Sequence, residues 1–136
     1  MSMPRDDVIA GSPRDWLRRA RSSLARARQE KPDEVLYEDL CFDAQQAVEK
    51  ALKALLVSRG VPFRFVHDIG ELLEGVAAGG IRIPEGLRDA SELTEYAVEA
   101  RYPGLYEPVS EEEWRRAVTS AEAVVTWVES QIDSTV

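Results

Sequence analysis

The chain of 136 residues is long enough for one globular domain with a substantial core, since 44% of its side chains are hydrophobic. Its net charge of -8 argues against a general nucleic-acid binder, because attraction to phosphate depends on clustered lysine and arginine. The sequence has neither the run of about eighteen apolar residues that spans a membrane nor the apolar block of a signal peptide, so no membrane association is expected.

The first predicted helix follows a flexible lead of residues 1–11. Ser12 is a favourable N-cap, and Pro13 suits the first helical position because its fixed φ matches a helix and its missing N–H is not needed there. The apolar stripe that follows predicts a helix that runs to about Glu30.

Basic residues are concentrated in this part of the chain. Residues 1–31 hold eight basic and four acidic side chains, whereas the remaining residues hold nine and twenty-one. Six arginines of the first helix form the one evident basic patch: Arg14, Arg18, Arg19, Arg21, Arg26 and Arg28. The patch would allow a local contact with RNA. A solvated helix surface, or one that matches the acidic remainder of the chain, is the simpler explanation.

The second predicted helix has two different faces. Asp33 is placed to cap it, and Gly60 provides a stop after Arg59. Its apolar side chains recur at the three- and four-residue spacings of a buried stripe. Four polar residues at spacings of four, three and four line the other face: Asp39, Asp43, Gln46 and Lys50.

Three further helices are predicted. The third runs from His67 or Asp68 to Ala78 and the fourth from about residue 85 to Arg101. Ser110 begins a capping box for the fifth, which runs to about residue 133.

Strand signals are nearly absent, because the only β-like segment, residues 61–66, contains a proline. The sequence therefore predicts an all-α, up-and-down bundle of about five helices with a four-helix core, which forms a single domain over residues 12–133.

Neither a metal nor another cofactor is expected. The sequence has one histidine, His67, and one cysteine, Cys41, so no metal-ligand spacing exists. A lone cysteine in a helix cannot form an intramolecular disulfide, which indicates a reducing, cytoplasmic compartment.

Three features together point to a known family. They are the run Q-Q-A-V-E-K-A-L-K-A-L-L from Gln45 to Leu56, a histidine that opens the third predicted helix, His67, and R-Y-P at residues 101–103. Over roughly residues 15–132, the chain resembles the HEPN domain, a helical domain of prokaryotic chains that often accompany a small nucleotidyltransferase. The resemblance implies a homodimer with a cleft between its second and fourth helices, and five ligand-binding candidates: Arg101, Tyr102, Gln46, Lys50 and Asp43.

The polar residues of this run have two interpretations. Gln46 and Lys50 would suit the edge of a nucleotide or phosphate site. An exposed, solvated helix face explains them without a ligand, and Glu49 and Lys53 would then form an ion pair worth a few tenths of a kcal/mol.

Arg101 also has two interpretations. With Leu93 and Ala97 it forms a ridge at spacings of four, so an inward guanidinium would need an acceptor such as Asp39, Asp43 or Glu49. In the ribonuclease members of the family that the chain resembles, an arginine and a histidine that are separated by four to six intervening residues cleave RNA across a dimer cleft.

Here, positions 106–108 hold Tyr106, Glu107 and Pro108, so the histidine is absent. Tyr106 is a poor base, since an unperturbed tyrosine has a pKa near 10. With Tyr102, it is a better candidate for stacking on a base, although loop tyrosines more commonly pack down. His67 is expected to bond to backbone or to cap its helix, since a catalytic role would need an orienting acceptor and a cleft.

These observations leave three hypotheses for function. The first is a non-catalytic module that binds a nucleotide, RNA or a nucleotidyltransferase chain as a homodimer, in the manner of a toxin–antitoxin-type companion; the acidic surface would suit a basic protein partner better than bare RNA. The second is a metal-independent ribonuclease that uses Arg101 with Tyr106 or His67. The third is a dimerisation domain without a small ligand.

Overall fold

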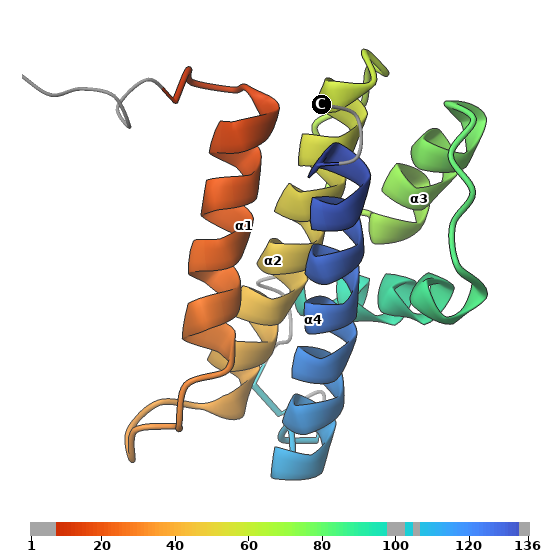
Figure 1. Cartoon of the computed structure of the whole chain (residues 1–136). Coiled ribbons are helices and arrows are strands. Elements are labelled where there is room, and N and C mark those ends of the chain that lie inside the picture. Colours follow the sequence, from red (N-terminus) through yellow and green to blue (C-terminus); the bar gives the residue numbers. More distant parts are fainter. Residues whose placement is uncertain (1–7, 98–102, 105–106, 134–136) are drawn as a thin grey trace, which may run out of the picture.

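The structure, a computed structural model, describes residues 8–97, 103–104 and 107–133 (Figure 1). Its helices, in chain order, are α1 (Pro13–Ala27), α2 (Tyr37–Ser58), α3 (Ile69–Ala78), the 3-10 helix η2 (Glu85–Ala97) and α4 (Glu111–Asp133). The described residues contain no β-strand, so the predicted all-α class is confirmed. None of these helices combines the length and apolarity that a bilayer crossing requires.

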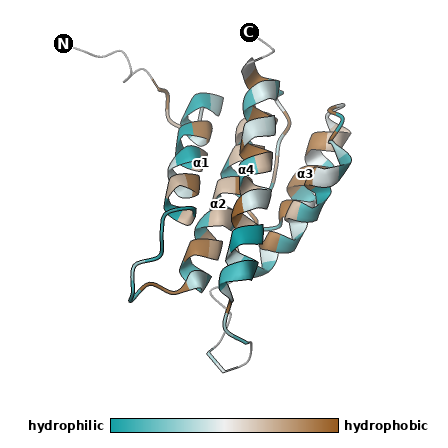
Figure 2. Cartoon of the chain, turned by 60° about the horizontal axis from the view of Figure 1, so that its bottom comes forward, coloured by the Kyte–Doolittle hydropathy of each residue, from teal (hydrophilic) through white to brown (hydrophobic). Residues whose placement is uncertain are grey.

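The second helix is the centre of the bundle. α2 packs against all four other helices, and α1, α2 and α4 lie side by side (Figure 1). Its leucines at positions 52, 55 and 56 are fully buried, because apolar residues cover most of its circumference. The outer helices each carry hydrophilic and hydrophobic residues (Figure 2), as expected of helices with one face on a core.

Most helix ends follow the signals in the sequence. The Ser12 hydroxyl accepts the backbone N–H of Asp15 at 3.2 Å, and the Ser110 hydroxyl accepts that of Glu113 at 3.0 Å. Gly60 follows α2 with φ of 70°, a left-handed conformation that glycine adopts without steric cost. These three predicted helix ends are thus confirmed. They can be predicted from the sequence because each depends on residues within one helical turn.

The link between α1 and α2 differs from the prediction. α1 ends at Ala27, earlier than expected, and Asp33 does not cap α2, whose N-cap position is held by Leu36 without a side-chain bond. The Lys31 ammonium instead donates to three backbone carbonyls of the link, most closely to that of Val35 at 2.8 Å. These bonds give the carbonyl groups of the link hydrogen-bond partners in a turn. α2 therefore begins later than predicted, at Tyr37.

The fourth helix has a different period from the one predicted. A 3-10 helix has three residues per turn, so its inward residues recur every three positions: Leu87, Ala90, Leu93 and Tyr96. The predicted ridge at spacings of four was therefore wrong, because Tyr96 rather than Ala97 continues the buried row. Arg101, the last member of that ridge, lies outside the described residues.

Trp114 fixes the start of α4 to the end of α1. Its indole N–H donates to the carbonyl of Ala27 at 2.7 Å, and its ring lies 5.3 Å from that of Tyr37. The indole is buried, so a tryptophan that the sequence places in an apolar stripe is confirmed as a core anchor.

Candidate functional site

The polar face of α2 lies along α1. Lys53 lies over the ring of Trp16 at 5.4 Å, the Lys50 ammonium donates to the Ser23 hydroxyl at 3.1 Å, and the Arg26 guanidinium is 3.0 Å from Asp43. These pairs follow an antiparallel register, with spacings of seven and three along α1 and of three and seven along α2, so each set lies on one helix face. We define this row as the polar seam: Trp16, Arg19, Ser23, Arg26, Asp43, Gln46, Lys50 and Lys53.

Lys50 is the least satisfied cation of the polar seam. Within the described part of the chain, the Ser23 hydroxyl is the only hydrogen-bond partner of its half-buried ammonium. Burial lowers the pKa of Lys50, and the nearby charges of Arg19 and Arg26 lower it further, against the weaker attraction of neighbouring carboxylates. The fold therefore holds the Lys50 ammonium near two other positive charges that repel it.

Asp43 is already engaged by α1. Its carboxylate is buried and 3.0 Å from the guanidinium of Arg26. Burial raises the pKa of Asp43, because the loss of hydration outweighs the attraction of Arg26. This predicted ligand-binding residue thus positions an arginine of the polar seam.

Glu49 is the hub of a buried polar cluster beside the polar seam. Only 2% of Glu49 is exposed, and its carboxylate accepts from Lys53 and from Gln45, each at 2.7 Å. It also lies 3.0 and 3.1 Å from Nδ1 of His67. Burial alone would raise the pKa of Glu49, but the bonds from Lys53, His67 and Gln45 lower it below its ordinary value.

The predicted Glu49–Lys53 pair forms, but the alternative that placed it on an exposed helix face was wrong. Both residues are buried, because the link after α2 brings Phe63 to 5.6 Å from the Lys53 ammonium and His67 onto the Glu49 carboxylate. The Gln46 amide extends the cluster, since it donates to the side-chain carbonyl of Gln45 at 2.7 Å.

His67 does not have the role expected from the sequence. The N-cap of α3 is Asp68, whose carboxylate accepts the backbone N–H of Glu71 at 3.1 Å. The His67 ring instead contacts Glu49 through Nδ1, while 66% of the side chain is exposed. A buried carboxylate that holds one ring nitrogen is the orienting acceptor that a histidine base requires.

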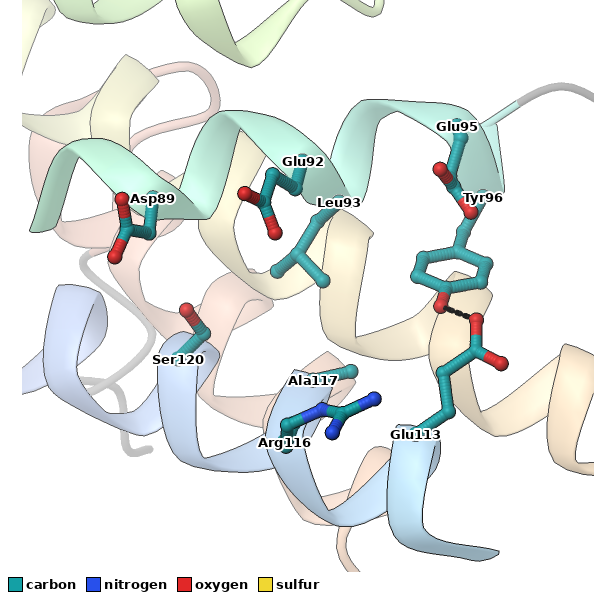
Figure 3. Close-up of a pocket in the computed structure, with 9 residues that line it drawn as sticks. All are labelled: Asp89, Glu92, Leu93, Glu95, Tyr96, Glu113, Arg116, Ala117 and Ser120. Carbon is teal, nitrogen blue, oxygen red and sulfur yellow. Dashed lines mark hydrogen bonds between the residues drawn. The ribbon is translucent and has the colours of Figure 1, made fainter. Parts of the chain in front are cut away.

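A cavity of about 380 Å³ lies on another face of the bundle, between η2 and α4. Figure 3 shows its lining side chains between the two ribbons. The charged ones among them are Asp89, Glu92, Glu95, Glu113 and Arg116. The Tyr96 hydroxyl donates to the carboxylate of Glu113, and burial together with this bond raises the pKa of Tyr96, so the phenol keeps its proton.

The sequence carries a signal for this cavity in the spacing of three acidic residues. Asp89, Glu92 and Glu95 recur every three positions, so on a 3-10 helix they form one column. Among the residues that the structure describes, no group of histidine, cysteine, aspartate or glutamate is arranged to hold a metal ion.

The arginines of α1 are largely matched by carboxylates. Arg18 and Arg19 bond to Asp15 at 2.8 and 3.0 Å, and Arg28 reaches Glu122 of α4 at 3.4 Å. The basic patch therefore matches the acidic remainder of the chain, as the simpler interpretation held, and little of its charge is left for a nucleic acid.

Comparison with known proteins decides the family. The family model of the HEPN domain matches residues 13–131, from the first residue of α1 almost to the end of α4. The chain belongs to the HEPN family.

Two solved structures resemble this HEPN domain. The crystal structure of ST0689, an archaeal HEPN homologue, is 30% identical with a TM-score of 0.71 and covers 89% of this chain and 98% of its own. The crystal structure of TT1696 from Thermus thermophilus is 31% identical with a TM-score of 0.73 and covers 88% and 98%. The comparison with curated proteins found no match.

The structure tests only some of the predicted site residues of this HEPN domain. Arg101, Tyr102 and Tyr106 lie outside the described residues, so their assembly with the polar seam stays a prediction. Gln46 and Lys50 are one turn apart in the polar seam, as the spacing predicted.

Proposed function

We propose that this HEPN domain is a non-catalytic binding module that acts as a homodimer and partners a separate nucleotidyltransferase chain, as half of a toxin–antitoxin-type pair. The observation that carries the proposal is the acidic cavity between η2 and α4. The dimer and the type of partner follow from the resemblance of the Gln45–Lys53 run to HEPN domains that accompany nucleotidyltransferases.

The charge of the cavity favours a basic segment of protein. Two carboxylates of its lining, those of Asp89 and Glu92, form no ion pair with the described residues, and the lining holds one guanidinium, that of Arg116. Charges in a partly enclosed site interact more strongly than charges in bulk water, so a lysine or arginine is attracted and a phosphate is repelled. The paired arginines of α1 do little to offset this preference.

The sequence after Arg101 supports a non-catalytic role. The place of the ribonuclease histidine is taken by Tyr106, Glu107 and Pro108, and the only histidine of the chain is His67. The group that would titrate near neutrality beside Arg101 is thus missing from its usual position.

A nucleotide or RNA is the small ligand that we propose for the same module. Arg101 and Tyr102 would contact it together with Gln46 and Lys50, in the cleft that the resemblance implies. Asp43 would act indirectly, because it already pairs with Arg26.

Co-expression with the product of the neighbouring gene, the proposed nucleotidyltransferase partner, tests the proposal. We expect the two chains to elute together in size-exclusion chromatography, and a double charge reversal of the cavity, Asp89→Lys with Glu92→Lys, to separate them. The matched control is Asp33→Lys with Glu34→Lys, which makes the same change of charge on exposed residues of the α1–α2 link. Separate elution of the unmodified chains, or equal disruption by both double variants, would contradict the proposal.

One observation favours the ribonuclease as a second candidate function. The contact between Glu49 and Nδ1 of His67 provides an orienting acceptor for the imidazole, which the sequence alone did not show. On this hypothesis, Arg101 would act in the cleft with His67 as the base, or with Tyr106.

RNA cleavage by the pure protein separates the two candidates. The ribonuclease hypothesis expects cleavage that is lost in both His67→Gln and Arg101→Ala. The binding-module proposal expects no cleavage by the unmodified protein. Equal activity in all three proteins would indicate a contaminating nuclease and remove the support for the second candidate.

A further inference from the structure

The acidic cavity between η2 and α4 adjoins a second cavity. The second one, also of about 380 Å³, is lined by Leu87 at the start of η2 and by Ala123 of α4, among others. Asp89, Arg116 and Ser120 line both cavities, so the two follow one another between the same helices. We define them together as the η2–α4 groove.

The two ends of the η2–α4 groove differ in chemistry. Tyr96 donates to Glu113 at the acidic end, whereas Gly86, Leu87 and Ala123 lie at the other. Ten positions of α4 separate Glu113 from Ala123, which corresponds to about 15 Å of helix. An extended chain advances about 3.3 Å per residue, so the groove has the length of a segment of about five residues.

Two carboxylates of the groove lack a counter-charge. Asp89 and Glu92 form no ion pair with any residue that the structure describes. The guanidinium of Arg116, which lines both cavities, lies 3.8 Å from Glu112 of its own helix. A binding partner that supplies cations to Asp89 and Glu92 therefore complements the groove.

These two carboxylates are spaced like alternate side chains of an extended peptide. Asp89 and Glu92 are three positions apart on a 3-10 helix, which rises about 2.0 Å per residue, so they are separated by about 6 Å along η2. Figure 3 shows them one after the other along the side of η2 towards α4. Alternate residues of an extended chain point to the same side, about 6.6 Å apart. Two basic residues at alternate positions of such a chain can therefore each face one carboxylate.

The same spacing leads on to the apolar end of the groove. Gly86 stands three positions before Asp89 and lines the second cavity beside Leu87. No atom lies within 4 Å of the place where a Cβ of Gly86 would be, so this end has open room. The next alternate side chain of the segment reaches this room. An apolar side chain is favoured there, because it removes the half-buried Leu87 from water.

We propose that the η2–α4 groove binds an extended segment of the partner protein that carries two basic residues and one terminal apolar residue at alternate positions. The basic residues pair with Glu92 and Asp89, and the apolar residue packs on Leu87. This inference rests on the proposed function, because it names the segment that the partner inserts. The two can fail separately: co-elution with the neighbouring gene's product tests the partner, whereas peptide binding by the isolated chain tests the groove.

An NMR titration of the full chain with short, end-blocked peptides at low ionic strength tests the groove. The probes are K-S-K-S-L and its reverse, L-S-K-S-K, because the spacing is the same in both directions. We expect at least one of them to bind and to shift the backbone amides of η2 and of residues 113–123. The tighter of the two gives the direction of the segment. The acidic peptide E-S-E-S-L should not bind.

Two further peptides separate this recognition from a general attraction of cations to an acidic protein. K-K-S-S-L has the composition of the first probe, but its two lysines point to opposite sides, so binding should weaken by about threefold with the loss of one ion pair. K-S-K-S-S lacks the apolar side chain and should bind about tenfold more weakly. If L-S-K-S-K is the tighter probe, the reversed sequences serve as controls.

Charge-removing variants of the chain test the two carboxylates. Asp89→Asn with Glu92→Gln keeps the size of both side chains and should weaken binding of the tighter probe by about tenfold. Asp33→Asn with Glu34→Gln makes the same change of charge on exposed residues of the α1–α2 link, so its affinity should stay within about twofold of the original.

Three results would overturn the proposal. The first is absence of binding by both probes. The second is equal affinity for K-S-K-S-L, K-K-S-S-L and K-S-K-S-S, or for the matching reversed set, which would show attraction without recognition of spacing or of the apolar residue. The third is a set of shifted amides away from η2 and α4. The peptide controls use the unmodified chain, so the test does not depend on the folding of any variant.

Discussion

Nδ1 of His67 lies 3.0 Å from Oε2 of Glu49, 18 positions earlier in the chain. This contact ties the link after α2 to the middle of that helix. Because Glu49 is buried and also accepts from Lys53, the link covers an ionised network rather than an apolar surface. Such a network stabilises the fold only while each of its members keeps a partner.

Substitution of Glu49 should therefore be costly. Glu49→Gln leaves the Lys53 ammonium buried without its counter-charge, and we expect the free energy of unfolding to fall by about 3 kcal/mol. Glu71→Gln is the matched control, because Glu71 pairs with an arginine whose side chain is 74% exposed; it should cost less than about 1 kcal/mol. Urea denaturation measures both, and equal losses would contradict the buried role of Glu49.

The acid dependence of stability should report the same carboxylate. The pKa of Glu49 is lowered in the folded chain from 4.5, because the bonds from Lys53, His67 and Gln45 outweigh the opposing effect of burial. As the pH falls, Glu49 therefore binds a proton in the unfolded chain before it does so in the folded chain. The stabilisation by ionised Glu49 is complete above about pH 4.5 and is lost as the pH falls towards the pKa of Glu49 in the folded chain. The difference in unfolding free energy between the unmodified chain and Glu49→Gln should shrink over this window. A difference that stays constant down to low pH would contradict the assignment.

Two lysines of the polar seam should respond in opposite ways to loss of charge. The pKa of Lys50 is lowered, so the unfolded chain binds its proton more tightly and the charge costs folding free energy at neutral pH. Lys50→Met should leave the free energy of unfolding unchanged or raised. Lys53→Met, which removes the partner of buried Glu49, should lower it by about 2 kcal/mol. Thermal unfolding of both variants checks this; equal destabilisation would indicate that Lys50 is a structural residue.

Trp114 should stabilise the end of α1 through one hydrogen bond. Trp114→Phe keeps an aromatic ring but leaves the carbonyl of Ala27 without the indole donor, so we expect a loss of about 1–2 kcal/mol in unfolding free energy. Trp127→Phe is the control, since Trp127 is only half-buried and should tolerate the change better. Equal losses of unfolding free energy in the two variants would contradict this prediction. They would indicate that burial of the ring, rather than the hydrogen bond to Ala27, accounts for the stabilisation by Trp114.

Local sequence signals predicted much of the fold. Ser12, Ser110 and Gly60 mark helix ends because each acts within one turn. The period of η2 differs from the prediction, although Ala90, Leu93 and Tyr96 recur every three positions, because long 3-10 helices are uncommon and a helix pattern ordinarily indicates the α-helical spacing of three to four.

The candidate sites were less predictable because they depend on contacts between distant segments. The polar ridge of α2 could be read from helical spacing, but its partners Ser23 and Arg26 follow from the antiparallel packing of α1. Burial of Glu49 depends on the path of the link to His67, which no periodicity encodes.

The salt dependence of partner binding tests the central claim most directly. The dissociation constant between this HEPN domain and the proposed partner, the product of the neighbouring gene, would be measured at low and at physiological ionic strength, with the Asp89→Lys, Glu92→Lys variant alongside. Binding that weakens with salt and is lost in the variant is the predicted result, because screening reduces attraction to exposed carboxylates. Absence of binding, or an affinity that neither salt nor the charge reversal changes, would contradict a module that docks its partner through the acidic cavity.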